Sequence, residues 1–232
     1  MIALIDYDAG NIRSVGNALT RLGAEFELTA SPERILSASK VILPGVGNAA
    51  EAMENLRKRG LCEVIRSLRV PVLGICVGLQ VLCRSSEEGP TEGLGIFDTF
   101  VKRFPTVDNF CYAKKKADAP QKLSTAGNSH KTNADASQKS IPTKEQAKVP
   151  HMGWNSIGNL ESKLFKDLVG GSFVYFVHSY YPELCPDTIA TCRHGETLFS
   201  AALRWENFYG TQFHPEKSGE VGAAILKNFL AL

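Results

Sequence analysis

A cysteine stands between two glycines in the stretch G-I-C-V-G at 74–78, directly after an apolar run. A G-x-C-x-G sequence between a strand and a helix has the mechanics of a nucleophile elbow, in which a sharp turn exposes one side chain above a sheet. A thiol at a helix N-terminus also meets a partial positive charge that favours the thiolate. Cys76 is therefore a candidate nucleophile, and an inert buried cysteine is an equally weighted alternative on position alone.

A thiol nucleophile needs a base, and the base needs a group that orients it. His214 and Glu216 stand two residues apart after an expected strand, which can put both side chains on one side. An isolated H-x-E pair is weak, because histidine and glutamate are common on protein surfaces. Joined to Cys76 on a parallel sheet, the pair predicts a Cys-His-Glu triad.

The third requirement is a set of N–H donors for a developing oxyanion. The backbone N–H of Val77, the residue after the cysteine, is one expected donor. The turn P-G-V-G at 44–47 could present the N–H groups of Val46 and Gly47, because glycine lets the backbone turn inward. An ordinary tight turn before a helix is the alternative. Neither a P-loop sequence nor G-x-G-x-x-G occurs in the chain.

Composition and charge narrow the class of protein. The 232 residues are 44% apolar and 22% charged, which is typical of a globular protein that can bury a sizeable core. Residues 113–148 carry eight lysines and three acids, a local +5 within a formal total of +2, so the rest sums to −3. A nucleic-acid ligand is therefore poorly supported. No apolar run approaches the length of a membrane span.

Six cysteines stand at irregular spacing without a C-x-x-C pair. Together with a first segment, M-I-A-L-I-D-Y-D, that reads as a strand rather than a signal peptide, this predicts reduced thiols and a cytoplasmic location. No tight Cys/His ligand pair is present, so we expect no metal site and no cofactor.

The apolar pattern predicts an α/β fold. Strands are expected at 2–5, 26–28, 41–43 and 70–75, with helices at 11–22, from 31, at 48–59 and at 77–84. Further strands are expected at 94–104, 173–180, 188–193, 197–204 and 210–213, before a last helix at 219–230. This order indicates a mostly parallel central sheet flanked by helices, with an appended antiparallel section. We expect one domain over 1–232, with a disordered, lysine-rich insertion near 113–148.

Three motifs, P-G-V-G, G-I-C-V-G-L-Q and H-P-E-K-S, occur in this order and resemble the class I, triad-type glutamine amidotransferases. Four further stretches are similar to the family of glutaminase subunits of imidazole glycerol phosphate synthase: D-Y-D-A-G-N at 6–11, V-P-H-M-G-W-N at 149–155, Y-F-V-H-S-Y-Y at 175–181 and T-Q-F-H-P-E-K-S at 211–218. The resemblance covers nearly the whole chain except 105–148, where the family passes through only a few residues.

The resemblance implies that Cys76 attacks the side-chain amide of glutamine, with His214 as acid and base and Glu216 orienting it. A γ-glutamyl thioester forms, ammonia leaves and water releases glutamate. The resemblance also assigns residues that hold the substrate: Gln80, Glu88, Ser179 and Tyr180. For Glu88 a solvated turn is a strong alternative, because E-E-G at 87–89 is a typical turn sequence.

The family partner is a (β/α)8-barrel cyclase, which uses the ammonia to make imidazole glycerol phosphate and aminoimidazole carboxamide ribonucleotide. The positions that resemble its docking face are Trp154, Asn155, Tyr175, His178 and Lys217. Core aromatics are a reasonable alternative for Trp154 and Tyr175. A paralogous glutaminase that feeds another synthase, for example in surface-sugar precursor synthesis, stays open. A catalytically silent regulatory subunit is disfavoured, because no triad member is missing.

Overall fold

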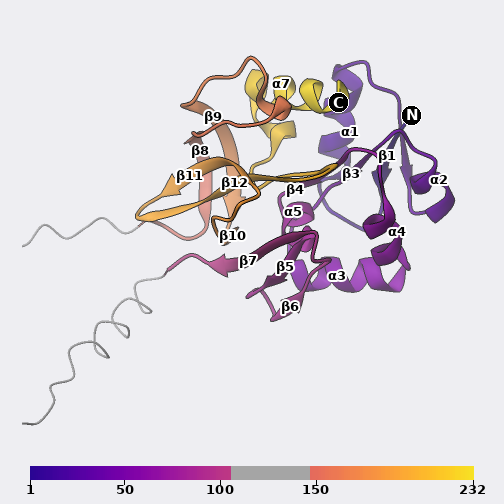
Figure 1. The fold of residues 1–232 in the computed structure, drawn as a ribbon, viewed down its shortest axis with the longest axis horizontal. Helices are drawn as coiled ribbons and strands as arrows, with labels where there is room; N and C mark the ends of the chain where they lie inside the picture. Colours follow the sequence, from indigo (N-terminus) through magenta and orange to yellow (C-terminus); the bar gives the residue numbers. More distant parts are fainter. Residues whose placement is uncertain (106–146) are drawn as a thin grey trace, which may run out of the picture.

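The structure, a computed structural model, describes residues 1–105 and 147–232 (Figure 1). Its centre is a seven-stranded sheet in the order β11-β12-β13-β4-β3-β1-β2. The strands are β1 (Ile2–Ile5), β2 (Phe26–Thr29), β3 (Lys40–Leu43), β4 (Val72–Ile75), β11 (Thr188–His194), β12 (Thr197–Trp205) and β13 (Phe208–Thr211). The pairings from β2 to β13 are parallel, whereas β12 pairs antiparallel with both β13 and β11. The predicted fold class is confirmed.

Helices cover both faces of this sheet, with α1 and α7 on one side and α3, α4 and α5 on the other (Figure 1). They are α1 (Ile12–Arg21), α2 (Pro32–Leu36), α3 (Ala49–Lys58), α4 (Leu61–Ser67), α5 (Val77–Leu82) and α7 (Gly219–Leu230). Strands β1 and β4 are buried along their whole length, as apolar strands covered on both faces should be. The core is therefore continuous through the middle of the sheet.

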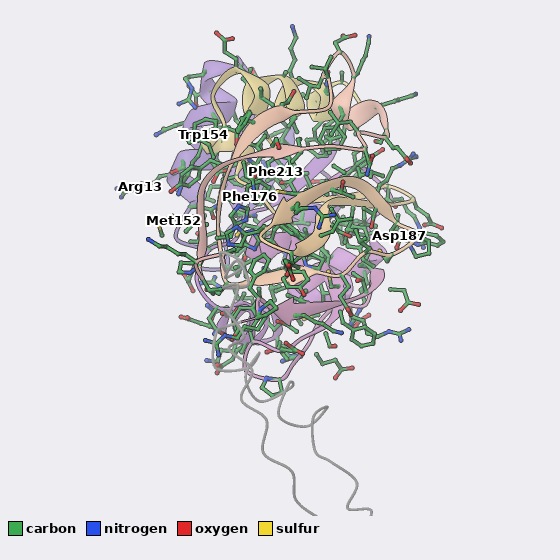
Figure 2. All side chains as sticks on the ribbon, turned by 90° about the vertical axis from the view of Figure 1, so that its left-hand side faces the viewer. Arg13, Met152, Trp154, Phe176, Asp187 and Phe213 are labelled. Carbon is green, nitrogen blue, oxygen red and sulfur yellow. The ribbon has the colours of Figure 1, made fainter. Side chains whose placement is uncertain are left out.

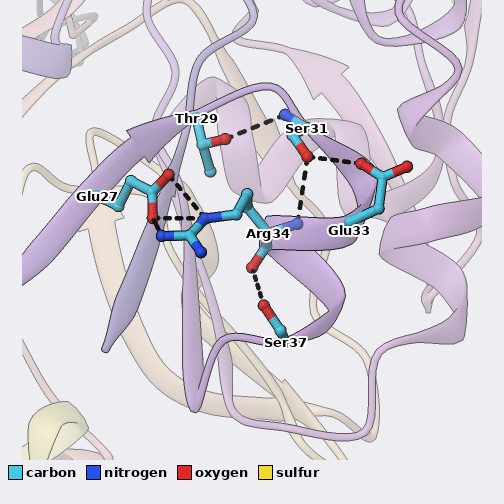
Figure 3. Close-up of polar contacts among 6 residues, drawn as sticks. All are labelled: Glu27, Thr29, Ser31, Glu33, Arg34 and Ser37. Carbon is cyan, nitrogen blue, oxygen red and sulfur yellow. Dashed lines mark hydrogen bonds and ion pairs between the residues drawn. The ribbon is translucent and has the colours of Figure 1, made fainter.

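Two of the described α-helices, α2 and α3, begin with a side-chain cap. The side chain of Asn48 accepts hydrogen bonds from the N–H groups of Ala50 and Glu51 at the start of α3. Figure 3 shows the same role for Ser31 at α2, where its Oγ accepts from the N–H of Arg34. The guanidinium of Arg34 also bonds both carboxylate oxygens of Glu27 on β2 (Figure 3). This pair is exposed, so it adds little stability.

Two smaller sheets flank the central one. The first has the order β10-β7-β5-β6, and the second pairs β8 with β9. Their strands are β5 (Cys83–Ser86), β6 (Thr91–Glu92), β7 (Phe97–Arg103), β8 (His151–Ile157), β9 (Ser172–His178) and β10 (Tyr180–Pro182). Two 3₁₀ turns, η1 (Lys163–Phe165) and η2 (Pro215–Lys217), complete the described elements.

Several expected boundaries were wrong. Helix α5 ends at Leu82 rather than near 84, because Cys83 enters β5 and pairs with β7. The strand expected at 173–180 is two strands, β9 and β10, on either side of Ser179. Strands β5, β6 and β8 and helix α4 were not predicted, since each is short or lacks a clear apolar period.

The predicted insertion lies outside the described residues as far as 146. Its last two residues, Ala147 and Lys148, are described, and the carbonyl of Lys148 hydrogen-bonds Nε2 of His194 at 2.7 Å. The fold therefore begins again two residues earlier than the expected boundary.

Among the described helices, none has the length and apolar character needed to cross a bilayer.

Candidate active site

The turn between β4 and α5 has the geometry of a nucleophile elbow. Cys76 adopts φ 54° and ψ −108°, a conformation that non-glycine residues rarely take. A Cβ on Gly78 would lie 2.1 Å from the carbonyl oxygen of Leu43, and one on Gly74 would lie 2.7 Å from the oxygen of Gly78. Glycine is therefore required on both sides of the cysteine.

The central sheet brings the two distant halves of the predicted triad together. Strand β13 lies beside β4 in parallel, with Thr211 opposite Ile75. The N–H of Cys76 donates to the carbonyl of Thr211 at 2.7 Å, so the two strand ends are joined where each chain leaves the sheet. Because carboxyl ends of parallel strands meet at one edge, Cys76 and His214 share a site.

His214 and Glu216 form a buried pair. Nδ1 of His214 donates to Oε1 of Glu216 at 2.8 Å, and both side chains are fully buried. The N–H of His214 donates to the carbonyl of Tyr175, which ties the start of η2 to β9. Because Nδ1 is engaged by the carboxylate, Nε2 is the ring nitrogen left to exchange a proton with a thiol.

Charge at this pair favours an imidazolium. Burial by itself lowers the pKa of His214, but the negative charge of a Cys76 thiolate opposes this, and the hydrogen bond and charge of Glu216 add to the rise. The result is a pKa of about 10 for His214. A proton taken from the thiol is therefore stable on the ring until a leaving group needs it.

A third residue supports the carboxylate. The side-chain amide of Asn11, which is buried just before α1, donates from Nδ2 to Oε1 of Glu216 at 3.1 Å. The same carboxylate oxygen thus accepts from both Asn11 and His214. Sequence reasoning assigned no role to Asn11, although it ends the D-Y-D-A-G-N stretch.

A pocket of about 260 Å³ opens beside the thiol. Its lining contains Cys76 together with every residue predicted for oxyanion stabilisation and glutamine binding: Val46, Gly47, Val77, Gln80, Glu88, Ser179 and Tyr180. Gly47 has φ 94°, so the turn needs glycine there. Glu88 accepts the N–H of Ala49 at 2.8 Å, while partial burial raises the pKa of its carboxyl. Glu88 is therefore part of the pocket wall rather than a free surface turn.

One buried histidine lines the pocket, and a second one contacts it. His178 is 6% exposed and lies in the pocket wall, although the sequence predicted it for the docking face. Its Nδ1 donates to the carbonyl of Tyr180 at 2.7 Å, and its Nε2 lies 3.0 Å from Nδ1 of His151. Burial lowers the pKa of each imidazole to about 3. Both rings are therefore neutral at neutral pH.

The other predicted docking residues lie on or near one exposed face. Trp154 is 55% exposed and packs edge-on against Tyr175, with ring centroids 6.2 Å apart. Nζ of Lys217 lies 6.0 Å from the centre of the Tyr175 ring. Figure 2 shows Trp154 near Met152, which is 63% exposed, along the same edge of the molecule. Trp154 is therefore not a core aromatic in this chain.

Asn155 differs from these neighbours. Its Nδ2 donates to the carbonyl of Arg193 at 2.9 Å and bonds Nε2 of His151 at 3.1 Å. It thus connects β8 to β11 and also holds the ring of His151 within β8. Among the described residues, no group of three His, Cys, Asp or Glu side chains could hold a metal ion.

Comparison with known proteins defines the class first. Residues 3–232 match the family model "Glutamine amidotransferase class-I". A solved structure of a glutamine amidotransferase superimposes on this chain with a TM-score of 0.63 at 17% identity. The alignment covers 100% of this chain and 98% of that structure. The structure of PurLQS from Thermotoga maritima superimposes with a TM-score of 0.61 at 14% identity. That alignment covers 99% of this chain and 97% of the PurLQS chain. These structures establish the shared fold.

Curated relatives define the narrower group. The imidazole glycerol phosphate synthase subunit HisH of Bacteroides thetaiotaomicron is 46% identical over 231 residues, covering 100% of this chain and 99% of the relative. The HisH subunit of Escherichia coli K12 is 38% identical over 233 residues with the same coverage. The chain belongs to the HisH family of imidazole glycerol phosphate synthase subunits, within the class I glutamine amidotransferases.

Proposed function

We propose that this chain hydrolyses glutamine to glutamate and ammonia as the glutaminase subunit of an imidazole glycerol phosphate synthase in histidine biosynthesis. The observation that carries the proposal is the strained Cys76, which joins a buried His214–Glu216 pair at the mouth of a small pocket. Identity with HisH subunits along the full length supports the particular synthase. The cytoplasmic location and the single domain expected from the sequence belong to the same proposal.

The site residues divide the chemistry between them. Sγ of Cys76 forms a bond to the side-chain carbonyl carbon of glutamine while His214 takes the thiol proton. His214 then gives this proton to the amide nitrogen, so the C–N bond breaks and ammonia leaves. Water adds to the thioester carbon as His214 removes its proton, and the C–S bond breaks to restore the thiol and release glutamate. Glu216 holds the ring in the tautomer that both steps need.

The oxyanion that forms during attack meets backbone N–H groups. Val77 follows the nucleophile at the start of α5, and Val46 and Gly47 line the same pocket. Removing one such donor costs on the order of 10² to 10³ in rate. The positive φ of Gly47 lets the peptide before it reorient, so docking of a partner and its ligand can align this donor.

The pocket recognises the two ends of glutamine with different groups. We assign Glu88 to the α-ammonium group, because it is the carboxylate in the lining and keeps one oxygen beside its bond to Ala49. Gln80 uses its side-chain nitrogen within the protein, so its Oε1 is the atom that can accept from the substrate. Ser179 and the backbone of Tyr180 border the same space.

Ammonia needs a closed path to its acceptor, since in water it would be protonated and lost as a nucleophile. We propose the (β/α)8-barrel cyclase as the partner, docked on the face that includes Trp154, Tyr175 and Lys217. Exposed aromatic area beside a cation is a frequent composition of protein interfaces. The described face stands beside His214, because the N–H of that residue bonds the carbonyl of Tyr175.

Glutamate release tests this proposal. It is measured for the full chain alone and then with the barrel cyclase from the same source and its nucleotide ligand. Strong stimulation by the cyclase with its ligand is the expected result. Glutaminase activity that ignores this cyclase would assign the chain to another synthase, and no glutamate release in any mixture would contradict the chemistry itself.

A further inference from the structure

Two buried side-chain amides connect the nucleophile to the pocket wall. Nε2 of Gln212 lies 3.6 Å from Sγ of Cys76, a distance that fits an N–H···S hydrogen bond. Oε1 of Gln212 accepts from Nε2 of Gln80 at 3.0 Å, and the same nitrogen also donates to the carbonyl of Tyr180 at 3.0 Å. Gln212 has no solvent exposure and Gln80 is 3% exposed, so water does not compete for these bonds.

A backbone carbonyl determines the direction of the whole chain of bonds. The oxygen of Tyr180 can only accept, so the group of Gln80 that faces it must be the NH₂. The second hydrogen of that NH₂ then faces Gln212, whose nearer atom must be its oxygen. The NH₂ of Gln212 is therefore left on the side of Cys76. Neither amide can flip without placing two donors or two acceptors together.

The strand holds Gln212 independently of its side chain. It follows β13 directly, and its backbone N–H donates to the carbonyl of Ala201 on β12 at 2.8 Å. His214 stands two residues further along, so one strand end presents both the base and this amide to the sulfur. Gln212 belongs to the stretch T-Q-F-H-P-E at 211–216. Within this stretch, the sequence pattern predicts a role only for His214 and Glu216.

We propose that Gln212 is a positioning residue that holds the Cys76 sulfur with an N–H donor, and that Gln80 and the Tyr180 carbonyl aim this donor. The role in turnover rests on the proposed glutaminase function, whereas the contact with the sulfur does not. A donor from a buried amide stabilises an anionic sulfur more than a neutral thiol. It also keeps the sulfur in one rotamer, between His214 and the pocket.

Loss of the Gln212 amide should affect the chemical step and substrate binding differently. Without the amide, the sulfur of Cys76 loses a donor that stabilises its anionic form, so the chemical step slows. The substrate still meets Glu88 and Oε1 of Gln80, so its binding is little affected. We therefore expect a fall in kcat with a nearly constant KM, which indicates an interaction that matters for chemistry rather than for binding.

The experiment compares three variants of the full chain. Gln212→Met keeps the length of the side chain and removes the donor. Gln212→Glu keeps an acceptor for Gln80 but turns a carboxylate oxygen toward the sulfur. Thr211→Val is the matched control, because Thr211 is equally buried next to Gln212 and its Oγ1 has no hydrogen-bond partner among the described residues. Circular dichroism and thermal melts verify that each variant is folded.

Two readouts are taken. The first is the rate of Cys76 alkylation by iodoacetamide between pH 5 and 10, followed by peptide mass spectrometry with Cys62 as an internal reference. We expect the pH midpoint to rise by about one unit in Gln212→Met, more in Gln212→Glu, and not in Thr211→Val. The second is glutamate release with the cyclase and its ligand, where Gln212→Met should lose about 10- to 100-fold in kcat with KM within about threefold.

The outcomes separate this proposal from the proposed function. Unchanged alkylation midpoints in folded Gln212→Met and Gln212→Glu would overturn the positioning role, whatever their kcat. A midpoint raised equally by Thr211→Val would do the same, because it would show a general effect of the strand end. If the wild type released no glutamate with the cyclase but Gln212→Met still shifted the midpoint, the positioning role would stand and the glutaminase assignment would fail.

Discussion

Asn11 donates a hydrogen bond to Glu216 at 3.1 Å across a separation of 205 residues in the chain. The contact joins the segment that follows β1 to η2, the turn that carries Glu216. It places a neutral donor on the carboxylate oxygen that also accepts from His214. The orientation of Glu216 therefore depends on both ends of the domain.

Replacing Asn11 with alanine should lower kcat by about 10- to 100-fold, because a hydrogen bond to a charged group contributes roughly 1.5–3 kcal/mol. Asn11→Asp should lose more, since a second carboxylate would face Glu216. The measurement is glutamate release by the complex with its cyclase. Asn17→Ala, an exposed change on α1, the helix that Asn11 precedes, is the control. An undiminished kcat in Asn11→Ala would remove this residue from the triad's support.

Gly78→Ala should damage the fold around the elbow. Its Cβ would lie 2.1 Å from the carbonyl oxygen of Leu43, and a backbone atom cannot move away cheaply. Overpacking of this kind costs about 1–3 kcal/mol, which lowers Tm by roughly 2–4 °C for each kcal/mol in a domain of this size. Gly170→Ala is the control, because nothing lies within 4 Å of its added Cβ. Equal melting temperatures for the two variants would contradict the predicted clash.

The buried histidines make stability depend on pH. Burial lowers the pKa of His151 and His178 to about 3 in the folded chain, whereas an unfolded histidine titrates near 6.5. Between these values the unfolded chain binds protons that the folded chain does not. The free energy of unfolding should therefore fall as pH decreases from 6.5, by up to about 1.4 kcal/mol per pH unit for each histidine.

Urea denaturation between pH 5 and 6.5 measures this slope before most carboxylates titrate. His151→Gln should make the slope shallower by about one proton. His214 acts in the opposite sense near pH 6.5, because its folded pKa is raised to about 10 while the unfolded residue is only partly protonated there; this contribution vanishes toward pH 5, where both states are protonated. A variant with the wild-type slope would mean that His151 is protonated in the folded chain.

Cys76→Ala should abolish glutamine-dependent synthesis by the complex and leave ammonia-dependent synthesis intact, because added ammonia bypasses the glutaminase step. Cys62→Ala, at a partly exposed cysteine of α4, serves as the control and should retain both activities. Equal loss of both activities in Cys76→Ala would contradict the proposed division of labour between the two proteins of the complex.

Removing residues 113–146 should leave glutamate release within about twofold of the full chain, because this stretch has few large apolar residues to add to a core. The deletion stops before Ala147, since the Lys148 carbonyl hydrogen-bonds His194. A large loss of activity in a folded deletion variant would show that the stretch acts at the site or at the partner.

Much of this arrangement could be predicted from local patterns. Alternating apolar strands and amphipathic helices indicate the sheet, and the flanking glycines of Cys76 indicate the elbow. The contacts of Asn11 and Gln212 could not be predicted, because their partners stand 205 and 136 residues away. The burial of His178 also escapes a local pattern, since only the pairing of β8 with β9 brings His151 against it. These positions are set by tertiary contacts rather than by local propensity.

Strand β13 is the last strand in the sequence, yet it lies between β12 and β4 within the central sheet. During synthesis, Cys76 leaves the ribosome long before the histidine that activates it. An unfinished chain therefore carries an idle thiol and cannot consume glutamine. The same order makes the final closure slow, because contacts between distant segments must wait for the whole chain. Glutaminase activity therefore appears only after the segment that carries His214 has been synthesised and β13 has joined the sheet.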